Sequence, residues 1–195
     1  MNPRVTLDTN CIIDLEPATD RAVAVQGLIA LHDSARIRLS IPAIMASERQ
    51  VGGRDFSSYD EFTDRLSKAG IGHLPHLEPM AYYDVSFFDH ALLCDETMAE
   101  LELSIHEILH SGSQFEYEDY CLKHMFHPES RPPTPRWRNA KCDVQVAWTH
   151  IHHKGNVLVT NDETFLKVSK LPQLIAIGAG AITRPKEALA LLAAF

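Results

Sequence analysis

Short apolar segments alternate with helical patterns at the start of the chain. The apolar segment Arg4–Leu7 predicts a strand, and apolar side chains recur every three or four positions over 19–35, which predicts a helix. Residues 37–41 alternate apolar and polar side chains, as a second strand does. Pro42 then opens a helix that we expect to run to Val51, before two glycines. The predicted order is strand, helix, strand, helix.

The last third of the chain shows the same alternation. We expect a helix over 142–154, a strand over 157–159 and a short helix over 163–169. A further strand is predicted over 174–177, and a closing helix over 185–194. Strands that are apolar throughout and are separated by helices indicate a parallel sheet covered on both faces. The predicted fold class is therefore α/β, a three-layer α/β/α domain.

The middle of the chain, residues 54–141, departs from this pattern. Two helices are expected there, over 59–68 and over 95–110, and the proline-rich segment 130–135 cannot continue a helix. We expect residues 1–195 to form one domain in which 54–141 is a helical insertion or cover. The apolar stripe of the 95–110 helix is either core or a groove for a partner, and it consists of Met98, Leu101, Ile105 and Leu109.

Composition adds that the protein is acidic. Its 26 Asp and Glu residues exceed its 18 Lys and Arg residues, which gives a formal net charge of -8. This balance argues against a protein that coats nucleic acid by charge alone, but it is compatible with an enzyme whose acids bind metal. The four cysteines form no CxxC pair, and no stretch reaches the roughly 20 apolar residues of a membrane span. We therefore expect a soluble cytoplasmic protein without a leader peptide.

Four acids lie where a carboxylate is costly unless it binds something. Asp8 and Asp162 follow apolar strands, at the sheet edge where ligands bind in parallel α/β folds. Glu48 and Asp143 fall on the apolar sides of their predicted helices. A divalent cation shared by these carboxylates would remove the cost of burying their charges. Because every ligand would be an oxygen atom, Mg²⁺ or Mn²⁺ is expected rather than zinc.

A metal site of this kind would activate water for attack on a phosphodiester bond. Asn10, Thr160 and Asn161 are the polar neighbours expected to hold the carboxylates or water in position. A single aspartate after a strand is explained as well by turn formation or helix capping. Only the joint pattern of four acids on four elements therefore indicates a catalytic site.

The motifs around these acids also have the order and spacing of a known family. They are VTLDTN at 5–10, IPAIMASE at 41–48, Asp143 at the start of a helix, LVTNDETF at 158–165 and ITRPKE at 182–187. In these segments the chain resembles the PIN-domain ribonucleases, which include toxins of bacterial VapBC-type toxin–antitoxin pairs. The resemblance covers about 3–53 and 141–195, whereas the middle segment lies outside it.

The resemblance implies a metal-dependent endoribonuclease in which Asp8, Glu48, Asp143 and Asp162 bind Mg²⁺ or Mn²⁺. For a toxin it also implies an antitoxin protein or a second copy of the chain as partner, but a stand-alone PIN ribonuclease fits the motifs equally well. Two other functions stay open. A PIN-like module could bind RNA or protein without cleavage. A haloacid-dehalogenase-like phosphatase also begins with a strand and an aspartate, but its chemistry needs a second aspartate where this chain has Asn10.

One dense basic stretch precedes the third acid. It consists of Arg131, Arg136, Arg138 and Lys141, with Trp137 among them. In one hypothesis, this stretch binds the RNA backbone while Trp137 stacks on a base, as in proteins that bind single strands. In the other, it is a solvated loop with Trp137 packed inward.

The histidines raise the alternative of a zinc site. His106 and His110 are spaced i, i+4, and Cys121, His124 and His127 also have ligand-like spacing, but neither set completes a four-ligand motif. His150, His152 and His153 are expected to face solvent at the end of a helix, where the helix dipole favours positive charge.

Overall fold

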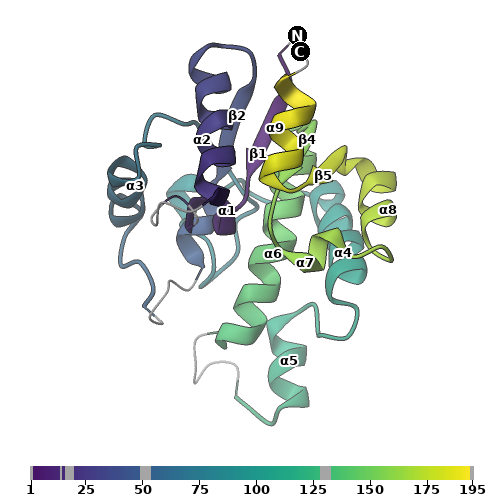
Figure 1. Cartoon of the computed structure of the whole chain (residues 1–195). Helices are drawn as coiled ribbons and strands as arrows, with labels where there is room; N and C mark the ends of the chain where they lie inside the picture. Colours follow the sequence, from purple (N-terminus) through teal and green to yellow (C-terminus); the bar gives the residue numbers. More distant parts are fainter. Residues whose placement is uncertain (1, 14, 16–19, 49–53, 128–132, 194–195) are drawn as a thin grey trace.

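A five-stranded parallel sheet forms the centre of the protein (Figure 1). The structure is a computed structural model that describes residues 2–13, 15, 20–48, 54–127 and 133–193. The strand order is β3-β2-β1-β4-β5, and every neighbouring pair is parallel. The strands are β1 (Arg4–Leu7), β2 (Arg38–Pro42), β3 (His76–Leu77), β4 (Val157–Val159) and β5 (Ala181–Thr183).

Helices cover both faces of this sheet, so the predicted α/β/α fold class is confirmed. One core contains side chains of α1 (Thr9–Ile13), α2 (Asp20–Asp33), α3 (Tyr59–Lys68) and α9 (Pro185–Ala193). The other contains side chains of α4 (Glu96–His110), α5 (Tyr117–Lys123), α6 (Pro135–His152), α7 (Glu163–Leu166) and α8 (Leu171–Leu174). Shorter helical turns are η1 (Ala43–Ser47), η2 (Phe88–His90) and η4 (Ile175–Ala179).

The two cores follow from the alternation of side chains along each strand. Val157 and Val159 of β4 pack into the core beside α2 and α9, whereas Leu158 packs into the core beside α6. β1 divides in the same way, with Val5 on the first face and Thr6 bonded to α6 on the second. All of these residues are buried, as expected for a sheet with helices on both faces.

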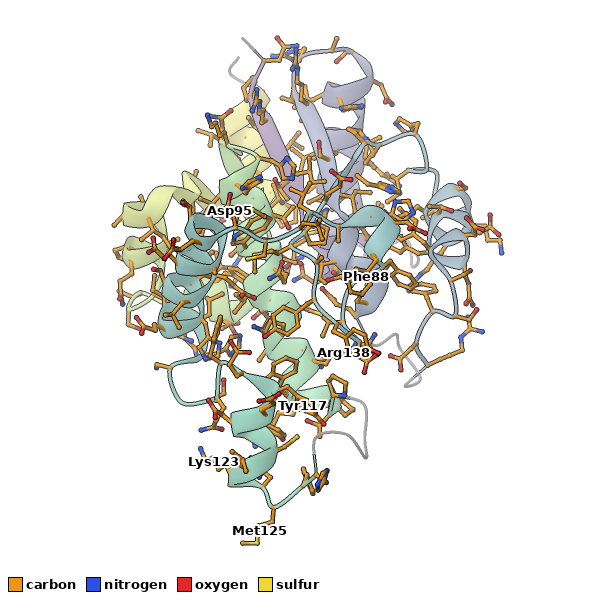
Figure 2. The ribbon with its side chains drawn as sticks, turned by 180° about the vertical axis from the view of Figure 1, so that it is seen from behind. Phe88, Asp95, Tyr117, Lys123, Met125 and Arg138 are labelled. Atoms are coloured by element: carbon orange, nitrogen blue, oxygen red, sulfur yellow. The ribbon has the colours of Figure 1, made fainter. Side chains whose placement is uncertain are left out.

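The middle segment contributes to both cores. The apolar stripe of α4 packs against α6, and Met98, Ile105 and Leu109 are buried in that contact. The interpretation of the stripe as core is therefore confirmed, and its use as an open partner groove is wrong. The end of α5 at Lys123 and the following residue Met125 project away from the sheet (Figure 2).

Three elements differ from their predicted bounds. The segment predicted as a strand over 174–177 is helical, and the strand comes later, at Ala181–Thr183. The φ angle is 107° at Gly178 and 60° at Gly180. These positive φ angles end the helical turns and redirect the chain into β5. The helix expected after Pro42 is only the turn η1, and 49–51 lie outside the described residues.

The long helix α6 begins at Pro135, well before the predicted start at 142. Thr134 caps it by accepting a hydrogen bond from the backbone N–H of Trp137, and Pro135 occupies the first turn. The helix predicted over 163–169 is shorter, because α7 ends at Leu166. Within the described part of the chain, none of the helices combines the length and apolar character needed to cross a membrane.

Candidate functional site

The carboxyl ends of the two central strands bring the first and the last predicted acid to one edge of the sheet. β1 and β4 pair with Leu7 opposite Val159, and the backbone N–H of Asp8 donates to the carbonyl of Val159 at 3.0 Å. Asp8 therefore lies at the point where β1 ends and α1 begins, and it is 5% exposed. Asp162 follows β4 on the neighbouring strand end.

Three hydrogen-bond donors hold the carboxylate of Asp8. Its Oδ1 accepts from the backbone N–H of Thr9 at 2.7 Å. Its Oδ2 accepts from Asn10 Nδ2 at 2.7 Å and from Thr160 Oγ1 at 2.6 Å. Hydrogen bonds to a carboxylate favour its charged form and fix its orientation. Asp8 is thus presented as an oriented anion at the sheet edge.

The predicted supporting residues tie the two strand ends together. Thr160 Oγ1 accepts from the backbone N–H of Asp162 at 2.9 Å, and Asn10 Oδ1 accepts from the backbone N–H of Asn161 at 2.8 Å. Asp162 also caps α7, since its Oδ1 accepts from the backbone N–H of Thr164 at 2.7 Å. Asp162 is therefore a helix cap, and this role is compatible with a role in binding.

Glu48 reaches the same edge from the end of η1. Its backbone is extended, with φ −76° and ψ 143°, so it does not lie on the apolar face of a helix as predicted. The hydroxyl of Thr9 donates to Glu48 Oε1 at 2.7 Å, which links this acid to the residue after Asp8. Thr9 was missed in the sequence because a threonine in a helix start has no distinctive spacing.

Asp143 on α6 has a partner from the middle segment. His110, the last residue of α4, places Nε2 3.1 Å from Asp143 Oδ2. Beside it, Lys170 donates a hydrogen bond from Nζ to the carbonyl of Leu109. The sequence marked His110 only by its spacing from His106, so its contact with an acid 33 residues away was not predicted.

The four acids act on one another electrostatically. Burial raises the pKa of Asp8 to about 6, and the charges of Asp143 and Asp162 contribute to that rise. Burial, followed by the charge of Asp8, holds the pKa of Glu48 well above its usual range. Burial also raises the pKa of Asp143, against the lowering effect of His110. The charges of Asp143 and Asp162, from two other elements, therefore reach both Asp8 and Glu48.

These residues fit a hydrated divalent ion. No three of the four carboxylates, all of which are described, place ligand oxygens within 4.8 Å of one another. Mg²⁺ commonly keeps several waters and binds proteins through one or two carboxylates directly. The donors are oxygen atoms, their charges repel one another, and a cation would offset that repulsion. The set fits Mg²⁺ or Mn²⁺ that retains part of its water shell.

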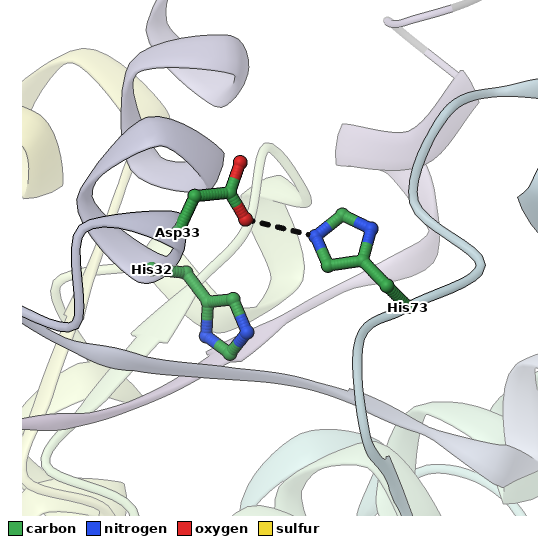
Figure 3. Close-up of side chains that lie close together, drawn as sticks. All are labelled: His32, Asp33 and His73. Atoms are coloured by element: carbon green, nitrogen blue, oxygen red, sulfur yellow. Dashed lines mark hydrogen bonds and ion pairs between the residues drawn. The ribbon is translucent and has the colours of Figure 1, made fainter.

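The zinc alternatives are not assembled among the described residues. The rings of His106 and His110 lie 6.3 Å apart, and His106 Nε2 bonds to the carbonyl of Ser113. The one described His, Cys, Asp or Glu group with converging atoms is instead His32, Asp33 and His73 (Figure 3).

In that group, which lies near the start of β2, His73 Nε2 is 3.0 Å from Asp33 Oδ1. His32 Nδ1 accepts the backbone N–H of Leu39 at 3.0 Å, so the neutral His32 ring carries its proton on Nε2. A metal at Nε2 would require that hydrogen bond to be given up, and two of the three residues are exposed. The group is therefore a poor candidate for a metal site.

The basic stretch requires a correction. Trp137 is 3% exposed and donates Nε1–H to the carbonyl of Gln114 at 3.1 Å, so it packs inward and cannot stack on RNA. Lys141 is 2% exposed and pairs with Glu102. Arg138 lies 3.6 Å from Asp55, and only Arg136 is exposed among the described members of the stretch. Arg131 lies outside the described residues.

Lys141 lies at the centre of a polar contact between α4 and α6. Its Nζ is 3.0 Å from Glu102 Oε1, and it lies 4.1 Å from the ring centre of Tyr82 and 4.0 Å from that of Phe115. Gln145 Nε2 donates to the same Glu102 oxygen at 2.7 Å. Burial lowers the pKa of Lys141 despite the opposing effect of Glu102. This contact holds α4, and with it His110, against the helix that carries Asp143.

Near the end of α6, His150 differs from expectation, whereas His152 is exposed as predicted. His150 is fully buried, with Nε2 2.8 Å from the carbonyl of Ala179 and Nδ1 2.8 Å from the hydroxyl of Thr6. Burial lowers its pKa to about 4, so this histidine is neutral rather than a cation at the helix end. His152 stacks on Trp148 with ring centres 4.4 Å apart.

Comparison of the chain with protein-family models, with curated proteins and with solved structures finds no match.

Proposed function

We propose that the protein is a metal-dependent endoribonuclease with a PIN-like domain. The observation that carries this proposal is the placement of Asp8 and Asp162 at adjacent strand ends on the carboxyl edge of the parallel sheet, with Glu48 bonded to Thr9 beside Asp8. The charges of Asp143 and Asp162 also raise the pKa of Asp8 and Glu48. A protein without a ligand there would bury like charges against one another at a cost in stability. The sequence motifs that resemble PIN ribonucleases contain these same four acids.

Each acid has a distinct surrounding and therefore a distinct task. Asp8, held by three donors, is oriented to bind the ion, and Glu48 and Asp162 bring further charge from η1 and from the end of β4. Asp143 is positioned by His110. When bound, a divalent ion would polarise the phosphate and lower the pKa of a water molecule. Thr160 and Asn10 keep the Asp8 carboxylate in place while charge develops on the phosphate.

The phosphatase alternative is disfavoured by the same geometry. Asn10 donates its amide to Asp8 Oδ2, so the group two residues after the aspartate is a hydrogen-bond donor and not a carboxylic acid. The finer proposals concern biology. A toxin paired with an antitoxin and a homodimer rest on the family resemblance, whereas a cytoplasmic location rests on the cysteine pattern. Co-purification with the product of an adjacent small open reading frame would test the antitoxin.

The variant Asp162→Asn separates the two roles of that residue. Asparagine caps helices about as well as aspartate, so the cap of α7 and the melting temperature should be retained. Loss of outer partners of metal ligands costs about 10–100-fold in activity, so loss of a ligand should cost at least about a hundredfold. Cleavage of single-stranded RNA would be measured with Mg²⁺, with Mn²⁺ and with EDTA. Full activity in Asp162→Asn would contradict the role of this acid.

The route of hydrolysis can be tested by the fate of solvent oxygen. If water is the nucleophile, cleavage in H₂¹⁸O should place one label directly in the product phosphate, and an RNA with a 2′-deoxy residue at the cut should still be cleaved. A 2′,3′-cyclic phosphate product, or loss of cleavage on removing that 2′-hydroxyl, would show that RNA attacks itself and would refute the metal-activated water.

A further inference from the structure

A cavity opens directly beside the third acid, between α6 and the middle segment. Its volume is about 460 Å³, within the range of cavities that bind small ligands. The lining residues that matter here are His110, Gly112, Arg136, Asn139, Ala140 and Asp143. In Figure 2, the label Tyr117 marks α5 and the label Arg138 marks the first turns of α6, at the end of the molecule where this cavity lies.

One face of α6 forms a wall of this cavity. Arg136, Asn139, Ala140 and Asp143 are spaced i, i+3, i+4 and i+7, so they follow one line along the helix. Seven residues of helix rise about 10 Å, so the cavity extends about that far from the candidate centre. Ala140 has a small side chain between the polar ends of this line. The wall therefore runs from an acid at the candidate centre to a cation at the far end.

The polar groups along this line are available for a ligand. Arg136 and Asn139 are exposed, and within the described part of the chain neither forms an ion pair or a side-chain hydrogen bond. The inward face of the same helix holds Trp137 and Lys141, both buried. A guanidinium group suits a phosphate, and a free side-chain amide can both donate to and accept from the edge of a base.

We infer that this cavity holds one nucleotide of a single-stranded RNA next to the phosphate that is cleaved. Arg136 contacts the backbone phosphate, and Asn139 contacts the edge of the base, which makes this cavity a determinant of which nucleotide is accepted. The inference rests on the proposed ribonuclease function, and it assigns substrate selection to the part of the chain outside the PIN-like motifs. Recognition through base edges and phosphates is the usual mode for single-stranded RNA.

Gly112 offers a way to fill the cavity without disturbing the fold. A Cβ atom built on Gly112 meets no atom within 4 Å, so a side chain there extends into open space. Gly112→Leu should block the nucleotide, whereas Gly112→Ala should leave room for it. Arg136→Glu reverses the charge at the far end, and Lys68→Glu on α3 makes the same charge change at an exposed position outside the cavity.

The first test is binding of a fluorescently labelled single-stranded RNA in EDTA, followed by anisotropy at several salt concentrations. Arg136→Glu should weaken binding about tenfold and lower the salt slope by about one. Gly112→Leu should also weaken it about tenfold, while Gly112→Ala and Lys68→Glu stay within about twofold of the wild type. Wild-type affinity in both Arg136→Glu and Gly112→Leu overturns the inference, as does no binding of RNA by the wild type. Because Gly112→Leu could misfold, its melting curve is compared with that of Gly112→Ala. If Gly112→Leu is unfolded, the affinity of Arg136→Glu alone tests the inference.

The second test is the position of cleavage, which separates this inference from the proposed function. Asn139→Ala should change the nucleotide preferred beside the cut, with a larger effect on KM than on kcat. If the wild type cleaves RNA with metal and Asn139→Ala and Gly112→Leu cut at the same sites and rates, the cavity inference alone fails. If the wild type binds RNA as expected and the cavity variants bind weakly, but no metal supports cleavage, the nuclease proposal fails while the cavity stands as an RNA-binding site.

Discussion

Replacing Lys141 with methionine removes the positive charge at the contact between α4 and α6. Lys141 and Glu102 are each 2% exposed, and their ion pair measures 3.0 Å. In Lys141→Met, the carboxylate of Glu102 stays buried, and among the described residues Gln145 Nε2 is its remaining hydrogen-bond donor. The variant thus leaves a charge in the interior without its counter-charge.

The cost follows from the surroundings of the pair. Removing one partner of a buried ion pair costs about 3–5 kcal/mol. Lys141 Nζ also lies 4.1 Å and 4.0 Å from the ring centres of Tyr82 and Phe115, contacts that are worth about 2 kcal/mol when desolvated. A methionine sulfur recovers about 0.3–1.5 kcal/mol of this against the same rings. We expect a loss of about 5 kcal/mol in the free energy of unfolding, out of the about 5–15 kcal/mol typical of a domain.

Urea denaturation and thermal melting measure this loss. A loss of about 5 kcal/mol lowers the melting temperature of a chain of this size by about 10–20 °C. Lys68→Met, at an exposed position, should change stability by less than about 0.5 kcal/mol. The double variant Lys141→Met with Glu102→Met removes both charges and should recover much of the loss.

Two results would refute this reasoning. Lys141→Met could prove as stable as the wild type, which would mean that Glu102 is not a buried charge. The double variant could lose the sum of the two single losses, which would mean that the two residues do not interact.

Three further predictions concern the acid site and the buried histidine. Without metal at pH 7.5, Asp143→Asn should be at least as stable as the wild type, because the raised pKa of Asp143 reflects an unfavourable charge. In melting experiments, Mg²⁺ at a hundred times its Kd should stabilise the wild type by about 2.7 kcal/mol and the variant much less. An equal Mg²⁺ effect on both proteins would contradict the metal site. Burial lowers the pKa of His150 to about 4, so the unfolded chain takes up the proton first as the pH falls from about 6.5 to 4. Over this range the wild type should lose about 3 kcal/mol of stability relative to His150→Gln, measured by urea denaturation. A stability difference that does not vary with pH would be inconsistent with this shift. Gly155→Ala should destabilise by about 1–3 kcal/mol, since its Cβ would lie 2.2 Å from ring atoms of His150, and an unchanged melting temperature would refute that packing.

The sequence predicted the elements whose patterns are local. The strands at 4–7 and 157–159 are short apolar segments between polar ones, and both are confirmed with the same bounds. The helix at 59–68 is also confirmed, because Ser58 caps its start by accepting from the backbone N–H of Glu61. The meeting of Asp8 and Asp162 follows from topology, since the ends of adjacent parallel strands share an edge.

The sequence failed where local patterns are ambiguous. The apolar run from Leu174 to Ile182 suits a buried helix as well as a strand, and the positive φ angles at Gly178 and Gly180 decide where the strand begins. The predicted start of α6, at 142 rather than at Pro135, also affected the interpretation of the basic stretch. The prolines of 130–135 indicate a linker, so the sequence assigns no helical face to Trp137. In the structure α6 begins at Pro135, and Trp137 is buried in the core.

Long-range contacts account for the rest. Nothing in the spacing of His110 indicates that it meets Asp143, and nothing local to Lys141 indicates that Glu102 neutralises it. Both contacts depend on how α4 packs on α6, which periodicity alone does not predict. They explain why the four acids could be chosen from the sequence while the neighbours that position them could not.

The central claim is that the acids at the carboxyl edge of the sheet bind a divalent ion and cleave RNA with it. The most direct measurement is the rate of RNA cleavage against Mg²⁺ concentration for the wild type, for Asp8→Asn and for Asp33→Asn, which changes an exposed acid in the His32 and His73 group. We predict saturable activation in the wild type and in Asp33→Asn, and a loss of at least about a hundredfold in Asp8→Asn. Cleavage that is equal in Asp8→Asn, or unaffected by EDTA, would contradict the claim.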